Sequence, residues 1–187
     1  MKKIAITLLA LTALQGCAVA LVGGVAVGAA TANDRRTIGA QIDDQSIEVK
    51  AYAMMAEDQE LDKSTQVQVV SLNGTVLIVG QALSSKDKQK IYSMVNQIQG
   101  VKKIHNQIRV ARLTSLGTKT HDTWLTTKVK SELLADDRVD GTAIKVVSED
   151  SEVFLMGLVG PKEADVAVDI TRHVGGVSRV YKAFELK

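Results

Sequence analysis

The hydrophobic positions of this chain recur in two similar blocks. Each block contains a nearly continuous apolar run that ends at a glycine, with residues 76–79 before Gly80 and residues 153–156 before Gly157. Runs of this kind predict central β-strands, and the glycines either end the strands or permit close backbone packing. The repeat spacing of about 77 residues indicates two copies of one small domain. The repeated segments are 44–50 with 122–128, 76–80 with 153–157, and 100–104 with 176–180.

Local signals predict the order helix, strand, strand, helix, strand in each copy. Asp44 and Asp122 stand where the first helix would begin, so we expect both to be N-caps that accept hydrogen bonds from free N–H groups. Asn73-Gly74 predicts a tight hairpin turn, because both residue types tolerate positive φ. The matching segment 148–151 predicts a looser, solvated turn. Residues 66–71 alternate as in a half-buried strand, with Val67, Val69 and Ser71 on the covered face.

The second helix of each copy has clear ends. In the first copy it spans residues 84–99 and begins at a serine cap; in the second it begins at Pro161 and stops at Gly175-Gly176. The helix joins two strands, and a right-handed crossover is expected. The prediction is an α+β chain of two domains, 44–112 and 113–187. Each domain is an αββαβ unit with a three-stranded mixed sheet packed on two helices.

The start of the chain predicts a lipoprotein signal. Lys2 and Lys3 precede an apolar segment too short to span a bilayer, and the run Leu14-Gln15-Gly16-Cys17 ends at the only cysteine. This run resembles a bacterial lipobox. The resemblance implies a signal peptide at 1–16 and, on Cys17, diacylglycerol plus an N-acyl chain, since a single acyl chain anchors a protein only marginally. The alternative is an ordinary secretory signal followed by an unrelated cysteine.

Residues 17–43 comprise the lipidated cysteine and a tether. The stretch 18–32 is uncharged and rich in Gly, Ala and Val, which favours a flexible tether over a second membrane segment. In lipoproteins of Gram-negative bacteria, which this chain resembles, Asp after the cysteine retains the protein at the inner membrane. Ala18 occupies that position, so we expect an anchor in the outer membrane, facing the periplasm.

Composition excludes several classes of function. The chain has 23 basic and 21 acidic residues, and because Lys2 and Lys3 lie in the signal, the remainder is neutral. No basic stripe with interleaved aromatics is present, so we expect no nucleic-acid partner. The three histidines lack metal-ligand spacing, and no serine lies in a nucleophile elbow. We therefore predict a protein that is not an enzyme and holds neither a metal nor a non-covalent cofactor. The histidines are His105, His121 and His173.

These features together resemble a known family. The element order, the strands ending at Gly80 and Gly157, and the sequence Asp-Thr-Trp-Leu-Thr-Thr-Lys-Val at 122–129 are similar to the BON domain. Two such domains behind a lipobox resemble the dual BON-domain outer-membrane lipoproteins of the DolP (YraP) family. The resemblance implies binding of anionic phospholipid, phosphatidylglycerol or cardiolipin, through the second domain. It also implies enrichment at the division septum and maintenance of outer-membrane integrity.

The first helix of the second copy carries its own argument for a lipid site. At about 100° per residue, Leu125, Val129 and Leu133 share the core face, while Trp124 and Leu134 project about 140° from its centre. In the first copy the matching positions are Ser46 and Ala56, as expected of a solvated face. Indole suits a membrane interface, and Lys128, with Lys130 less directly, can meet phosphate. The predicted phospholipid-binding residues are Trp124, Thr127, Lys128, Ser131 and Leu134.

Two other functions stay open at this point. The chain could be a scaffold that grips an envelope partner such as an outer-membrane assembly machine, with Trp124 in contact with protein. In a packing alternative, Trp124 instead packs against the first domain and fixes how the two copies sit. It could also carry a small hydrophobic ligand, which would need an internal cavity that such short domains do not readily enclose. Exposure of Trp124 separates the membrane hypothesis from the packing alternative.

Overall fold

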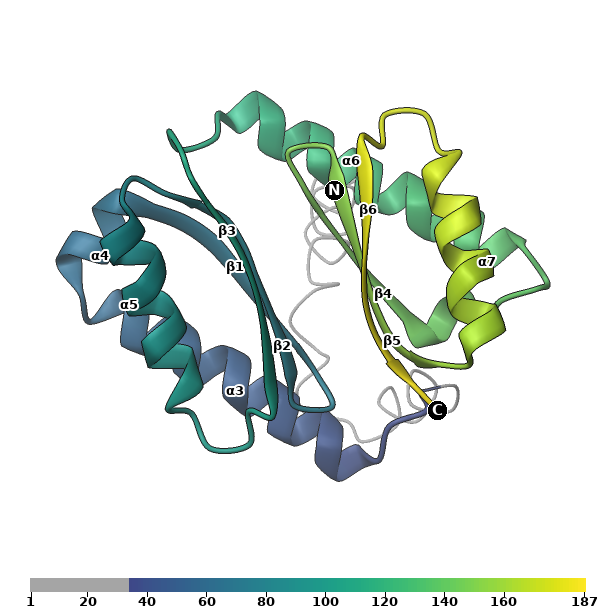
Figure 1. Cartoon of the computed structure of the whole chain (residues 1–187), viewed down its shortest axis with the longest axis horizontal. Helices are drawn as coiled ribbons and strands as arrows, with labels where there is room; N and C mark the ends of the chain where they lie inside the picture. Colours follow the sequence, from purple (N-terminus) through teal and green to yellow (C-terminus); the bar gives the residue numbers. More distant parts are fainter. Residues whose placement is uncertain (1–33) are drawn as a thin grey trace, which may run out of the picture. The chain divides into compact units, whose positions relative to one another are not determined.

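The structure is a computed structural model that describes residues 34–187 (Figure 1). The predicted signal peptide, Cys17 and tether residues 18–33 lie outside the described residues. The first domain contains α3 (Ile38–Ala56), α4 (Gln59–Ser64), β1 (Thr65–Leu72), β2 (Thr75–Ala82), α5 (Ser85–Asn96) and β3 (Lys103–Val110). The second contains α6 (Leu116–Ala135), the 3-10 turn η3 (Gly141–Ala143), β4 (Ile144–Glu149), β5 (Glu152–Val159), α7 (Pro161–Arg172) and β6 (Arg179–Leu186).

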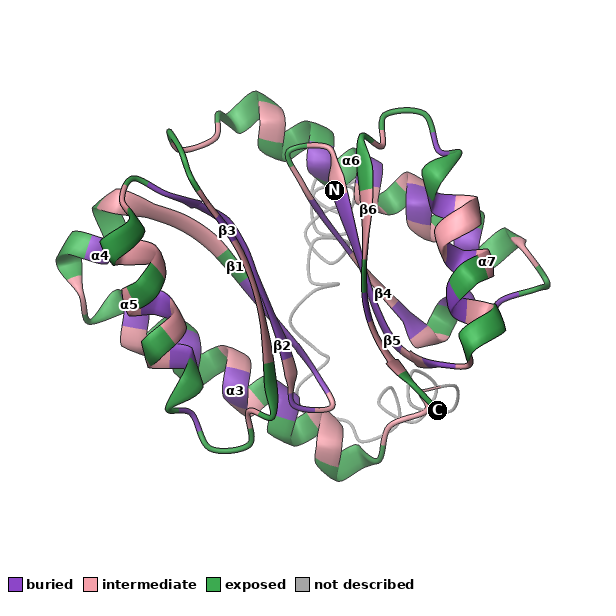
Figure 2. Ribbon diagram, in the orientation of Figure 1, coloured by how far each residue is buried: buried purple, intermediate pink, exposed green. Residues whose placement is uncertain are grey.

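Each domain is built on a three-stranded mixed sheet. In the first, β2 is central, antiparallel to β1 and parallel to β3; in the second, β5 is antiparallel to β4 and parallel to β6. Both central strands are buried along almost their whole length (Figure 2). The predicted α+β fold of two αββαβ units is therefore confirmed. The short helix α4, in a segment without apolar periodicity, was not predicted.

The two sheets are covered differently on their two faces. Helices α3 and α5 pack on one face of the first sheet, and α6 and α7 on one face of the second. The opposite faces contribute to one shared hydrophobic cluster, which we term the intersheet cluster. It consists of Val70, Leu72, Leu77, Val79, Val147, Phe154, Met156 and Ala183. Because of this cluster, the second half of β1 is buried on both faces, and the predicted half-buried alternation is wrong there.

Asp44 and Asp122 are not N-caps, contrary to the prediction. Helix α3 begins six residues before Asp44, with Thr37 as its cap, and α6 begins after Ser115. Both aspartates lie within their helices and are 3% and 6% exposed. Their carboxylates accept hydrogen bonds from the backbone N–H groups of the hairpin turn instead. The sequence signal for a polar partner of free N–H groups was correct, but the N–H groups belong to the turn.

Both hairpins use the same tight turn. Asn73 and Gly74 have φ of 53° and 79°, as predicted, and Asp150 and Ser151 have φ of 50° and 65°. The looser turn predicted for the second copy is therefore wrong. Ser84 caps α5 by accepting from the N–H of Asp87, and Pro161 is the first residue of α7, both as predicted. Helix α5 ends at Asn96, three residues earlier than expected.

Gly80 and Gly157 lie where paired strands approach closely. Gly80 has φ of 125° and pairs with Val67, and a Cβ atom there would lie 2.1 Å from the carbonyl oxygen of Gln66. A Cβ atom on Gly157 would lie 2.7 Å from the carbonyl oxygen of Ala143. Neither position has room for a side chain without a shift of the neighbouring strand.

Candidate functional site

Helix α6 is longer than the sequence predicted and presents an uncharged face to solvent. Its buried residues are Asp122, Leu125, Val129 and Leu133, so the predicted core face is confirmed. At about 100° per residue, the opposite side carries a stripe without any charged side chain over the whole helix. We term it the α6 stripe; it consists of Leu116, Thr120, Thr123, Trp124, Thr127, Ser131 and Leu134.

Three large apolar side chains of the α6 stripe are open to solvent. Leu116 is 83% exposed, Trp124 53% and Leu134 54%. Such exposure forgoes about 25 cal/mol for every Å² of apolar surface left in water, and large contiguous apolar patches mark interaction surfaces. Leu116 and Thr120 were missed in the sequence, because the helix was expected to begin only at Asp122, and Thr123, at the expected start, was not assigned to this face. A serine at 115 followed by helical spacing was the available signal.

The hydroxyl groups of the α6 stripe are satisfied within the helix. Each of four side chains donates to the carbonyl oxygen four residues earlier, at 2.9 to 3.0 Å: Thr120 to Leu116, Thr123 to Lys119, Thr127 to Thr123, and Ser131 to Thr127. A hydroxyl bonded in this way has its donor satisfied by the helix backbone. Because these groups need no hydrogen bond from water, the stripe can leave water at low cost.

Trp124 makes its ring contacts within the second domain. The Nζ atom of Lys128 lies 4.9 Å from the centroid of the indole and donates to the carbonyl oxygen of Gly175 at 3.2 Å. The centroid of the His121 ring lies 5.9 Å from the centroid of the indole. More than half of the indole is open, rather than covered by the first domain as the packing alternative requires.

The basic residues around the α6 stripe differ in their availability. Lys119 is exposed and Lys128 is partly exposed, and the two lie on opposite flanks of the stripe. The Nζ atom of Lys130 instead donates to the carbonyl oxygens of Gly141 and Ile144, each at 2.6 Å. Burial lowers the pKa of Lys130. These two hydrogen bonds make Lys130 less available to a phosphate than Lys128, which makes one, and Lys119 is a further exposed cation beside the stripe.

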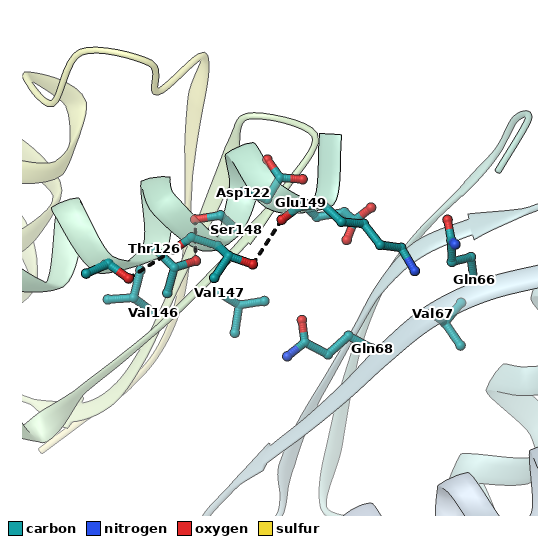
Figure 3. Close-up of a pocket in the computed structure, with 12 residues that line it drawn as sticks. Gln66, Val67, Gln68, Asp122, Thr126, Val146, Val147, Ser148 and Glu149 are labelled. Carbon is teal, nitrogen blue, oxygen red and sulfur yellow. Dashed lines mark hydrogen bonds between the residues drawn. The ribbon is translucent and has the colours of Figure 1, made fainter. Parts of the chain in front are cut away.

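A polar pocket of about 400 Å³ lies between α6, β4 and β1, and Lys119 and the stripe residues Thr123 and Thr127 form part of its lining (Figure 3). Thr126 donates to the hydroxyl of Ser148 at 2.8 Å on its wall. Burial raises the pKa of Glu149, whose carboxylate accepts from the side-chain amide of Gln81 at 2.6 Å. This largely polar lining does not suit the small hydrophobic ligand of the carrier hypothesis. No group of three metal-ligating side chains occurs within residues 34–187, and no helix there is long and apolar enough to cross a membrane.

Comparison with known proteins identifies the family. Residues 43–112 and 121–187 each match the BON domain. Over 185 residues the chain is 40% identical to the outer membrane lipoprotein DolP of Haemophilus influenzae, covering 99% of this chain and 96% of that protein. The chain belongs to the DolP family of BON-domain outer-membrane lipoproteins. The predicted family and outer-membrane localisation are thereby confirmed.

Two other relatives of this DolP-family chain align with 80% of its length. It is 36% identical over 149 residues to the 21 kDa hemolysin of Actinobacillus pleuropneumoniae, covering 80% of this chain and 77% of the relative. It is 28% identical over 153 residues to osmotically-inducible protein Y of Escherichia coli, covering 80% and 76%. None of these three names is that of an enzyme. Among solved structures, the C-terminal domain of CdsD from Chlamydia trachomatis aligns with a TM-score of 0.31 and 12% identity over 74% of this chain and 96% of that one. A TM-score of this size does not establish a shared fold.

Proposed function

We propose that this DolP-family lipoprotein binds anionic phospholipid through the α6 stripe. Bound in this way, it helps to maintain outer-membrane integrity and is enriched at the division site. The observation that carries the proposal is a 20-residue helix whose entire outer stripe is uncharged, with four hydroxyls satisfied internally and Trp124 exposed at its middle. Indole favours the boundary between acyl chains and headgroups, so Trp124 anchors the helix at that depth.

The charge around the stripe supports an anionic headgroup. Lys119 and Lys128 lie on its two flanks, where each contributes about 1 kcal/mol near an anionic surface. Residues 114–187 carry more acidic than basic side chains, so the attraction is local to this helix. Thr127, Ser131 and Leu134 complete the predicted contact surface. Phosphatidylglycerol and cardiolipin are the lipids that such a surface fits.

The intrinsic fluorescence of Trp124 tests the proposal. Residues 35–187 form one compact unit, so a fragment without the first 33 residues separates the helix from any lipid anchor. We expect a saturable blue shift when vesicles containing phosphatidylglycerol are added, and none with phosphatidylcholine alone. Trp124→Glu should abolish vesicle co-sedimentation while circular dichroism stays unchanged. Unchanged binding of the folded Trp124→Glu variant would refute the proposal.

A further inference from the structure

The first domain carries a second uncharged helix stripe, at positions most of which match the α6 stripe. Helix α3 exposes Ile38 (66%), Ile42 (62%), Val49 (62%) and Tyr52 (42%). These four side chains fall within about 80° of one another on the side opposite the buried residues of the helix. We term them, with the exposed Gln45, Ala53 and Ala56 between them, the α3 stripe. Ala56 is exposed and Ser46 is partly exposed, as expected of a solvated face, but the same side of the helix also exposes these four large side chains, which were not singled out from the sequence.

The flanks of the α3 stripe have the opposite charge to those of the α6 stripe. Three charged residues lie beside it on one flank, Asp43, Lys50 and Glu57, and all three are exposed. The matching positions of α6 are His121, Lys128 and Ala135, none of which is a carboxylate. On the second flank α3 has Gln41 and Glu48, whose carboxylate pairs with Lys145 at 3.1 Å, where α6 has Lys119 and Thr126. An anionic bilayer would attract α6 and repel α3.

The layer order also separates the two stripes. Each stripe faces away from its own sheet, and the two sheets meet at the intersheet cluster between them. Figure 1 shows α3 beside the first sheet and α6 beside the second, so sides of these helices that are turned away from their own sheets are also turned away from each other. When α6 lies on a membrane, the α3 stripe faces away from that membrane. Two copies docked on the same membrane would both direct their α3 stripes away from it, so neither stripe would face the other.

We infer that the α3 stripe is the docking surface for a protein partner whose own surface is apolar and rimmed by basic side chains. The orientation argument rests on the proposed function, whereas the exposed apolar stripe and its acidic flanks do not. The apolar side chains supply the area, as an amphipathic helix does in a hydrophobic groove. Asp43 and Glu57 select a basic rim and disfavour an acidic one.

Site-specific photo-crosslinking of the full-length protein in cells tests the inference. A photoreactive residue replaces Val49, at the middle of the α3 stripe, and in a matched control it replaces Gln89, an exposed residue of α5. We expect one discrete adduct with another protein at position 49 and none at 89. Ile42→Asp should lower the adduct yield about tenfold or more, because a charge replaces an apolar side chain that the bound partner would cover. Glu57→Lys should lower it severalfold and Lys50→Glu should raise it, since the partner's rim is basic.

Each other outcome overturns the inference. The first is that no adduct forms at position 49, and the second is that the adduct joins two copies of this chain or contains lipid alone. The third is that Glu57→Lys raises the adduct yield and Lys50→Glu lowers it. Ile42 is mostly exposed, so Ile42→Asp should fold; Ile38→Asp provides a second variant if it does not. Trp124→Glu should leave the position-49 adduct intact. Unchanged vesicle binding by Trp124→Glu would refute the lipid proposal, whereas the crosslinking result at position 49 would still decide whether the α3 stripe binds a protein.

Discussion

A single carboxylate in each domain ties the first helix to the hairpin turn. Asp44 accepts from the backbone N–H groups of Asn73 and Gly74 at 2.7 and 2.9 Å, and from the Ser71 hydroxyl at 2.7 Å. Asp122 accepts from the N–H groups of Asp150 and Ser151 at 2.7 and 2.9 Å. A turn with positive φ at both central residues directs these N–H groups toward the helix. The carboxylate therefore accepts hydrogen bonds from turn N–H groups that do not pair with a neighbouring strand.

Removing either carboxylate should destabilise its domain. Asp44→Ala leaves buried backbone N–H groups without partners, and we expect the free energy of unfolding to fall by about 3 kcal/mol. Asp122→Ala should have a similar effect. Asp43→Ala, at the exposed neighbouring position, should change it by less than about 0.5 kcal/mol. Urea denaturation followed by circular dichroism measures all three. Equal stability of the Asp44→Ala and Asp43→Ala variants would contradict the assigned role.

Asp44 should also make stability depend on pH. Burial opposes its ionisation, but hydrogen bonds from Gly74, Ser71 and Asn73 and the guanidinium of Arg36 outweigh burial and hold its pKa below the usual value. Because the pKa is lower in the folded protein, the stabilisation is complete above the unfolded value of about 4 and is lost as the pH falls below it. Asp44→Asn should flatten this acid dependence. An unchanged slope between pH 5 and 3 would contradict the argument.

Helices α3 and α6 show how one element is adapted to two environments. Both use the same core positions and the same outer positions, but α6 has hydroxyl-bearing residues where α3 has aliphatic ones. The flanking charges then decide which surface each stripe can approach. A Ser or Thr hydroxyl bonded to the carbonyl four residues back removes its own need for water. The α6 stripe is therefore apolar in effect although its sequence is largely polar.

This view of α6 predicts that Thr127→Val is tolerated. Its hydroxyl already donates to the carbonyl oxygen of Thr123, so vesicle binding should stay within about twofold of the original or become stronger. Thr127→Asp should weaken binding about tenfold or more, because a charge would enter the stripe. Co-sedimentation with vesicles containing phosphatidylglycerol measures both. A large loss with Thr127→Val would mean that the hydroxyl contacts a headgroup directly.

At the scale of the whole molecule, two sets of contacts join the domains, a hydrophobic cluster and the hydrogen bonds of Arg35. The intersheet cluster includes Phe154, whose ring stacks on Tyr181 with centroids 4.7 Å apart. Arg35, which precedes α3, binds the second domain: its guanidinium donates to both carboxylate oxygens of Glu163 at 2.7 and 2.9 Å, and to the carbonyl of Leu158. The chain that leads into the first domain is therefore held on the second.

Truncating the intersheet cluster should weaken the joint between the domains. Phe154→Ala removes a large buried side chain, and we expect a loss of about 3 kcal/mol or more in the free energy of unfolding. Calorimetry should show one transition for the original chain and two for the variant, because the domains then unfold separately. Tyr181→Phe keeps the stacked ring and serves as the control. One transition in both variants would contradict this coupling.

The Arg35 contact predicts a second acid-dependent contribution. The bidentate hydrogen bond from Arg35 lowers the pKa of Glu163 to about 2. The stabilisation is therefore complete above the unfolded pKa of Glu163, near 4.5, and is lost as the pH falls toward 2. Glu163→Gln should reduce the free energy of unfolding by about 2 kcal/mol at pH 7 and by much less at pH 2.5. Equal losses at both pH values would exclude an ionic origin.

Much of the fold follows from local sequence signals. The apolar runs before Gly80 and Gly157, the Asn73-Gly74 turn, and the starts of α5 and α7 were predicted because each depends on backbone geometry or burial within a few residues. The two wrongly predicted N-caps share one cause. Asp44 and Asp122 carry a signal for partners of free N–H groups, but those groups lie in a hairpin about 30 residues away in the chain.

The sequence by itself determined that this chain has two αββαβ units and a core stripe on each first helix. It also marked Trp124 as a residue outside that stripe. These properties arise from periodicity and turn chemistry, which act over short stretches of chain. Only the tertiary structure decided that α3 begins at Ile38 and α6 at Leu116. It also decided that Lys130 donates to backbone carbonyls of its own domain, and that the two sheets share the intersheet cluster. Those features depend on contacts between segments distant in the chain, because burial there is set by what packs on each face.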